Sequence, residues 1–106
     1  MRFLAYDLAL ALIRGLQAPL ATVRRHNTAL AKQGTNAVDS VLLNLAEGSG
    51  RDGGDRLHHY RIALGSLREV GAVLDIAAAH GWLDDAPHAR ERDRLCGMIY
   101  GLQRRR

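Results

Sequence analysis

The chain has 106 residues and a formal net charge of +4, and hydrophobic residues make up 47% of it while aromatic residues make up only 5%. This length predicts one domain, residues 1–106, whose thin core of aliphatic side chains favours packed helices over a sheet. The single cysteine excludes an internal disulfide, and because no secretion signal precedes the first helical pattern we expect a cytoplasmic protein.

The first apolar pattern predicts a helix from about Arg2 to Gln17. Its segment FLAYDLALALI is apolar on two adjacent stripes, which indicates two burial surfaces. The segment carries Asp7 and is shorter than the roughly 20 apolar residues that a membrane span requires, so we expect a buried helix. Pro19 has no backbone N–H to donate, and we therefore expect this helix to end in a turn near residues 18–20.

A second helical pattern runs from Leu20 to about Gly48, with no distinct signal for its start. Its later part carries a polar ridge whose members are spaced four, three and four residues apart and share one face: Ser40, Asn44, Glu47 and Arg51. Because a dry, unpaired polar group costs roughly 1 to 3 kcal/mol, we expect hydrogen bonds to a neighbouring helix or subunit, with Ser66 and Glu69 as partners. A contact with a ligand or with nucleic acid is the alternative interpretation.

The glycine-rich segment GSGRDGGD, residues 48–55, predicts a reversal between antiparallel helices, with Asp55 as the N-cap of a third helix. That helix, from Arg56 to His80, has small or apolar residues at spacings typical of coiled-coil-like packing: Leu57, Tyr60, Leu64, Leu67, Gly71, Leu74 and Ala78. A neighbouring stripe is also small or apolar, so one partner helix would not cover both. Gly81 is expected to end the helix, with Trp82 folding back onto it.

A fourth helix is predicted to follow Pro87 and to run to about Gln103. The net charge is concentrated there, because residues 90–106 contain six arginines and two acidic residues whereas residues 1–89 are balanced. Such a surface attracts polyanions by counterion release. The candidate nucleic-acid contacts are Arg24, Arg25, Lys32, Arg90, Arg92, Arg94, Arg104, Arg105 and Arg106. The alternative is a solvated, Arg-rich helix end, about residues 103–106, that complements the helix dipole.

Four helices with short connections predict an all-α fold, an antiparallel up-down-up-down four-helix bundle. Because the first and third helices are apolar on more than one side, we expect another copy of the chain to cover the surplus face. The chain is thus predicted to form a homo-oligomer.

The residues that support catalysis or cofactor binding do not occur in the required patterns. His58 and His59 are adjacent and point about 100° apart on a helix, so they cannot both bind one metal ion. The glycine-rich segment lacks the Gly-Lys-Ser/Thr of a P-loop, and Cys96 adjoins apolar positions as a small core or interface residue does. We therefore expect no cofactor, no metal and no enzymatic activity.

Two stretches carry a family resemblance: LAKQGTNAVDSVLLNLAEGSGR, residues 30–51, and YRIALGSLREVGAVLDIAAAHGWL, residues 60–83. Together they resemble the four-helix bundle family of proteins encoded in intervening sequences of bacterial 23S rRNA genes, which is related to the accessory variability determinant of diversity-generating retroelements. The motif NLAEG followed by Arg51 and the motif ALGSLRE are more specific as a pair than either is alone. With the first helix aligned by pattern, the resemblance covers nearly the whole chain.

The resemblance implies a homopentamer shaped as a barrel with a central opening, and in the retroelement relatives a basic surface that binds nucleic acid and a partner reverse transcriptase. Many relatives have a basic pair just after the position of Gln33, where this chain reads Gly-Thr-Asn. Its basic surface would therefore come from Arg24, Arg25 and Lys32 or from the Arg-rich end. Our hypothesis from the sequence is a non-enzymatic accessory protein that contacts RNA or DNA phosphates without an aromatic platform for reading bases. The alternative is a protein-interaction scaffold, for example a partner of a reverse transcriptase, without intrinsic nucleic-acid binding.

Overall fold

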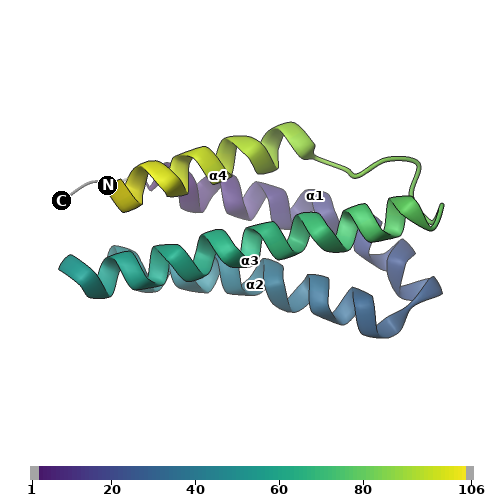
Figure 1. The fold of residues 1–106 in the computed structure, drawn as a ribbon, viewed down its shortest axis with the longest axis horizontal. Helices are drawn as coiled ribbons and strands as arrows, with labels where there is room; N and C mark the ends of the chain where they lie inside the picture. The colour runs from purple at the N-terminus through teal and green to yellow at the C-terminus, as the bar shows by residue number, and fades with distance from the viewer. Residues whose placement is uncertain (1–2, 105–106) are drawn as a thin grey trace.

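A computed structural model describes residues 3–104 and contains four helices. Their bounds are Leu4–His26 for α1, Thr28–Ser49 for α2, Gly53–Ala79 for α3 and Ala89–Arg104 for α4. Within these residues there is no strand, so the predicted all-α class with four helices is confirmed. Successive helices run in opposite directions along the long axis of the bundle (Figure 1).

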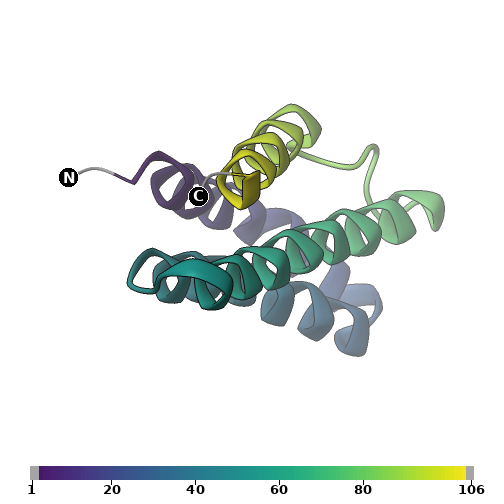
Figure 2. The same cartoon turned by 60° about the vertical axis from the view of Figure 1, so that its left-hand side comes forward.

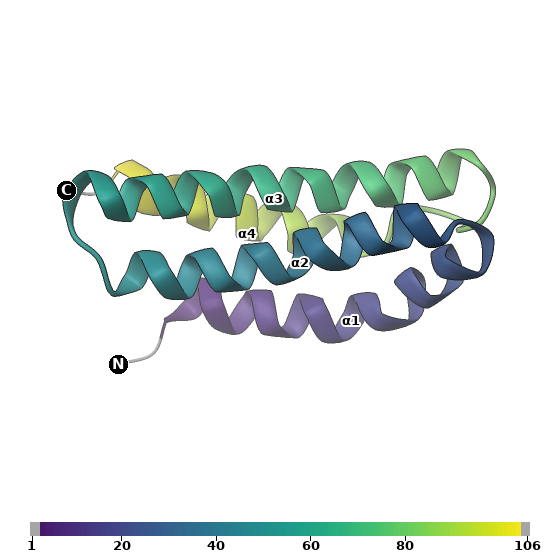
Figure 3. The same ribbon diagram turned by 90° about the horizontal axis from the view of Figure 1, so that it is seen from below.

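The two ends of the bundle carry different connections (Figures 1 and 3). The start of α1, the end of α4 and the short α2–α3 turn lie at one end, and the α1–α2 turn and the longer α3–α4 loop lie at the other. Each helix packs against its neighbours in the chain, and α4 also contacts α1, which closes the bundle (Figure 2). Because α3 has 27 residues and α4 only 16, α4 covers part of the length of α3.

The core is aliphatic, as the composition predicts. Its most deeply buried large side chains come from all four helices: Leu16, Leu45, Leu67, Leu74, Leu95 and Ile99. The seven-residue pattern of α3 faces this core, with Leu57 and Ala78 only partly buried at its two ends. No helix within residues 3–104 is both long enough and apolar enough to cross a bilayer, in agreement with the expectation for the segment that contains Asp7.

The prediction that Pro19 ends the first helix is wrong, because α1 continues through it to His26. Pro19 lacks the N–H that would bond to the carbonyl of Gly15, four residues earlier. That carbonyl accepts a hydrogen bond from Nε2 of His88 instead, at 3.1 Å, across the bundle from the α3–α4 loop. Leu16 and Leu20 on either side of the proline are buried, so packing stabilises the helix beyond the missing backbone bond.

His88 reaches α1 because of two local features. Its own φ of 58° lies in the left-handed region, which turns the loop directly before Ala89, the first residue of α4. A Cβ on Gly15 would lie 2.8 Å from Nε2 of the ring, so the absent side chain leaves the space that the ring occupies. The start of α4 is therefore held against α1 by a contact between residues far apart in the chain.

The structure defines the start of the second helix, which the sequence left open, and the predicted start of the third helix is wrong. α2 begins at Thr28, because Asn27 is extended and its Oδ1 accepts a hydrogen bond from the N–H of Leu30 at 2.9 Å. α3 begins at Gly53, with Asp52 rather than Asp55 at the N-cap. The Asp52 side chain makes no capping hydrogen bond, which leaves the first amides of α3 without a side-chain acceptor from the cap.

The end of α3 follows the prediction. Gly81 has a φ of 79°, and the N–H of Trp82 donates to the carbonyl of Ala77 at 3.0 Å, as in a Schellman motif. The Trp82 indole stacks on the rings of His26 and His80, with centroids 5.1 and 4.4 Å away. This stack joins the ends of α1 and α3 at the α1–α2 end of the bundle.

Candidate nucleic-acid interface and the neighbouring polar network

A continuous polar network joins α2 to α3. The hydroxyls of Ser40 and Ser66 are 2.7 Å apart, and Nδ2 of Asn44 donates to the carbonyl and to the hydroxyl of Ser40 at 2.9 and 3.2 Å. Oδ1 of Asn44 lies 3.0 Å from Nδ1 of His59. Because these groups are only partly buried and each finds a partner, the network fixes the register of the two helices without leaving dry, unpaired atoms.

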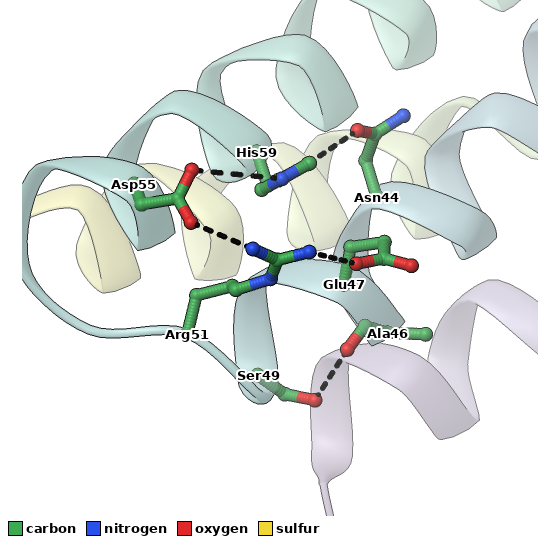
Figure 4. A network of polar contacts seen from close by, with 7 residues as sticks. All are labelled: Asn44, Ala46, Glu47, Ser49, Arg51, Asp55 and His59. Atoms are coloured by element: carbon green, nitrogen blue, oxygen red, sulfur yellow. Dashed lines mark hydrogen bonds and ion pairs between the residues drawn. The ribbon is translucent and has the colours of Figure 1, made fainter.

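The network determines which nitrogen of His59 carries hydrogen. The Ser40 carbonyl can only accept, so the Asn44 amide must point its NH₂ towards Ser40 and its Oδ1 towards the imidazole. Nδ1 of His59 therefore donates to Asn44 (Figure 4). The opposite nitrogen, Nε2, lies 3.9 Å from a carboxylate oxygen of Asp55.

At the α2–α3 turn the network ends in paired charges. Arg51 bonds to Glu47 at 3.3 Å and to Asp55 at 3.1 Å, and Figure 4 shows its guanidinium between the two carboxylates. The hydrogen bond that Arg51 donates to Glu47 and the charge of Asp55 raise the pKa of Arg51 above its ordinary value. These groups are half exposed, so the pairs fix the turn more than they stabilise the fold.

The ridge predicted from the sequence is thus brought together by the structure, with one exception and two additions. Ser40, Asn44, Glu47 and Arg51 share the network, whereas Glu69 is exposed and has no hydrogen bond or ion pair among residues 3–104. Asp55 and His59 also belong to the network, and the sequence did not predict them as members of it. Their signal was present as a spacing of four that continues from the ridge across the turn, through positions 47, 51, 55 and 59.

The basic residues that the sequence singled out do not form one patch. Arg24 and Arg25 are exposed at the end of α1, where Arg25 donates to the hydroxyl of Thr22 at 3.1 Å, and Lys32 is exposed in the early part of α2. Arg24 lines a small pocket together with the carboxylate-bearing Asp39. This group lies at the α1–α2 end, away from the end of α4.

The arginines of α4 differ in what they contact. Arg90 and Arg94 are exposed, but Arg92 is partly buried, donates to the carbonyl of Pro87 at 3.1 Å and lies over Gly71 of α3. The guanidinium of Arg104 lies 5.8 Å from the centre of the Tyr100 ring. Arg105 and Arg106 lie outside the described residues.

A groove lined by arginines, the arginine groove, lies between α3 and α4. It consists of two adjoining pockets, of about 720 and 290 Å³, which share Arg61 and Gln103. The polar and aromatic side chains that line it are Arg56, Arg61, Arg68, Tyr100, Gln103 and Arg104. No carboxylate lines either pocket, and none of the four arginines has an ion-pair partner within residues 3–104.

Three of these arginines, at positions 56, 61 and 68, were not predicted as nucleic-acid contacts, because they lie in a segment whose charges balance; Arg68 was expected instead beside Ser66 and Glu69 as a partner of the polar ridge. The acidic residues that balance them are elsewhere: Asp55 pairs with Arg51 on the opposite side of α3. A spacing of five and seven residues along one helix is the only local signal.

The Cys96 thiol lies near Arg68, beside the groove. Burial raises the pKa of the Cys96 thiol, and the positive charges of Arg68 and Arg92 oppose that shift. A thiol with a raised pKa is a poor nucleophile at neutral pH. Among the described residues no three His, Cys, Asp or Glu side chains gather as metal ligands would.

The fold and the site together define a small all-α bundle with a basic groove on one side of its longest helix. A family model described as 23S rRNA-intervening sequence protein matches residues 4–101. The chain therefore belongs to the 23S rRNA-intervening sequence protein family, and the resemblance inferred from its two motifs is confirmed. We found no significant match among curated proteins or among solved structures.

Proposed function

We propose that this protein is a non-enzymatic accessory protein that binds RNA or DNA through the arginine groove. The observation that carries the proposal is the contrast in pairing: Arg51 has two carboxylate partners, whereas Arg56, Arg61 and Arg68 have none among the described residues. Unpaired guanidiniums along a groove provide a track for phosphates. The exposed Tyr100 ring adds an aromatic surface for a base, which the sequence hypothesis did not include.

A binding titration tests this proposal. We expect fluorescently labelled single-stranded RNA or DNA to bind with weak sequence preference, and with an affinity that falls steeply as salt rises from 50 to 200 mM. The variant Arg61→Gln/Arg68→Gln should lower the salt slope by about one for each arginine that contacts a phosphate. The matched control is Arg24→Gln/Arg25→Gln, which removes the same charge at the other end of the bundle.

Three results are informative. Loss of affinity in the groove variant but not in the control supports the groove. The reverse pattern assigns binding to the end of α1 and overturns the groove proposal. No measurable binding of RNA or DNA at 50 mM salt removes nucleic-acid binding altogether.

We also propose that the chain assembles with itself, as a homopentamer of the kind that the family resemblance implies. Leu43, Ile62 and Ile76 are large apolar side chains that stay 65%, 37% and 43% exposed on α2 and α3. Burying such side chains against another copy is favourable by roughly 25 cal/mol per Å² of apolar surface. Five copies would also bring five groups of unpaired arginines into one particle.

The mass in solution tests assembly. A pentamer has five times the chain mass of 11.6 kDa, and Leu43→Glu should lower the mass while leaving helicity unchanged, because Leu43 contributes little to the protomer core. Wild-type protein that sediments as one chain at micromolar concentration would contradict the proposal. In that case the same apolar side chains would favour the second candidate, a scaffold that binds a partner protein such as a reverse transcriptase.

A further inference from the structure

The larger pocket of the arginine groove has a composition that differs from the rest of the groove. It lies at the α2–α3 end of the bundle, between the first turns of α3 and the last turn of α4, and has a volume of about 720 Å³. Arg56 and Arg61 line it from α3, Gln103 and Arg104 line it from α4, and Gly53 and Gly54 form its edge. Three arginines thus line one pocket.

Two nitrogen donors in this pocket have no acceptor. Nε of Arg56 and Nε2 of Gln103 are shielded from solvent and form no hydrogen bond within residues 3–104. Buried donors in folded proteins are almost always paired, so these two donors beside the pocket retain hydrogen-bonding capacity that a bound acceptor can use once the Arg56 and Gln103 side chains turn towards it.

The positive charge of the pocket indicates which kind of acceptor group it would bind. A backbone phosphodiester carries one negative charge, whereas a phosphomonoester carries about 1.5 to 2 at neutral pH and has three acceptor oxygens. With three guanidiniums and no carboxylate in its lining, the pocket matches the monoester better. Arginine is also the side chain best suited to hold phosphate oxygens in pairs.

The surroundings of the pocket indicate what the phosphate is attached to. The pocket opens into the second, smaller pocket of the groove through the shared Arg61 and Gln103, and that part continues to Arg68 and the 53% exposed Tyr100. A strand whose end sits in the pocket would place its next phosphates and bases along this path. We propose that the pocket binds the terminal phosphate of a nucleic-acid strand, an inference that rests on the proposed function of the groove.

The test compares two oligonucleotides of identical sequence, one with a 5′-phosphate and one with a 5′-hydroxyl, by fluorescence anisotropy with the label at the 3′ end. We expect the phosphorylated strand to bind about tenfold more tightly, because charge-assisted hydrogen bonds to one group are gained. Arg56→Gln should abolish this preference. The matched control Arg94→Gln removes an exposed arginine that lines neither pocket and should preserve the preference.

The outcomes separate this inference from the proposed function. Equal binding of the two strands by the wild-type protein overturns the terminal-phosphate site while leaving the groove in place. A preference that survives Arg56→Gln equally overturns it. If neither strand binds at 50 mM salt, the proposed function fails, and this inference fails with it.

One further arm distinguishes the strand end from a free phosphate. Inorganic phosphate and a nucleoside 5′-monophosphate are added as competitors at millimolar concentration. Stronger binding of the phosphorylated strand than of either competitor supports a strand-end site, since the rest of the groove adds contacts. Competitors that match the strand in affinity contradict it, because the pocket then takes a small phosphate without the strand.

Discussion

The two sides of α3 use polar residues in opposite ways. Towards α2, the hydroxyl of Ser66 and the imidazole of His59 meet groups of complementary chemistry, and Asp55 bonds to Arg51. Towards α4, Arg56 and Arg61 face a groove with no carboxylate. Within residues 3–104 the polar groups of the α2–α3 interface pair with each other, whereas the α3–α4 groove has no carboxylate to pair with its arginines.

This difference shows that polarity between helices does not by itself identify a functional site. The α2–α3 network sets the register of two helices, and its partners are already present. The α3–α4 groove retains charge and hydrogen-bonding capacity that an external group can use. Mutations on the two sides of α3 test this difference, and we describe them from the largest expected effect to the smallest.

The largest effect is expected from a substitution in the hydrophobic core, against which α3 packs. Leu67 is 2% exposed in the core, and Leu67→Asp places a charge there without a partner. We expect a loss of more than about 3 kcal/mol of unfolding free energy, measured by thermal or urea denaturation followed by circular dichroism. The control Glu69→Ala, at an exposed position outside the network, should stay within about 0.5 kcal/mol of wild type. A wild-type melting curve for Leu67→Asp would contradict the assigned core.

The next effect opens the α2–α3 network alone. Asn44→Ala removes the group that links Ser40 to His59 and should cost about 1 to 2 kcal/mol. Measured with His59→Ala and the double variant, the two residues should show a coupling free energy of about 0.5 to 1 kcal/mol. Additive losses would mean that the hydrogen bond between them contributes nothing.

A smaller and opposite result is expected on the groove side. Arg56→Gln and Arg61→Gln should leave stability unchanged within about 0.5 kcal/mol, because neither side chain has an ion-pair partner to lose. Arg51→Gln, which removes two ion pairs, should lower the melting temperature at low salt and less so at high salt. Equal destabilisation by all three variants would erase the contrast between the two sides.

The smallest effect concerns the chemistry of Cys96 beside the groove. Since burial raises the pKa of its thiol, less thiolate is present at pH 7 than for an exposed cysteine, and alkylation should be slower and should keep accelerating to higher pH. Arg68→Gln should slow the reaction further, because the positive charge of Arg68 lowers that pKa. Arg61→Gln serves as the control, and equal rates in both variants would contradict the placement of Arg68 beside the thiol.

The sequence was sufficient for the elements whose signals are local. The seven-residue pattern of α3 identifies its buried side, and Gly81 marks its end, because both follow from spacing within one helix. The course of α1 beyond Pro19 could not be predicted, since the group that replaces the missing backbone bond is His88, 73 residues away from Gly15. Rules that consider only the residues next to a proline cannot predict a hydrogen bond from so distant a residue.

The candidate site was predictable only in part, for a related reason. Counting charges by segment locates the surplus at residues 90–106 but treats all balanced charges as paired. Arg56 has an acidic neighbour in the sequence, Asp55, yet the Asp55 carboxylate points away from the groove to Arg51. Which arginines remain unpaired depends on the direction of each side chain around α3, and that direction is set by the packing of three helices.

The contact between His88 and the carbonyl of Gly15 couples three positions that are far apart in the chain, Gly15, Pro19 and His88. Replacing Pro19 by alanine would restore a backbone donor to that carbonyl, although alanine is the better helix former. The imidazole would then share its acceptor with the new amide, because a carbonyl oxygen has two lone pairs, and the contact between α1 and the start of α4 would weaken. A proline within α1 thus leaves a carbonyl that binds the loop before α4, and it links the course of α1 to the place where α4 begins.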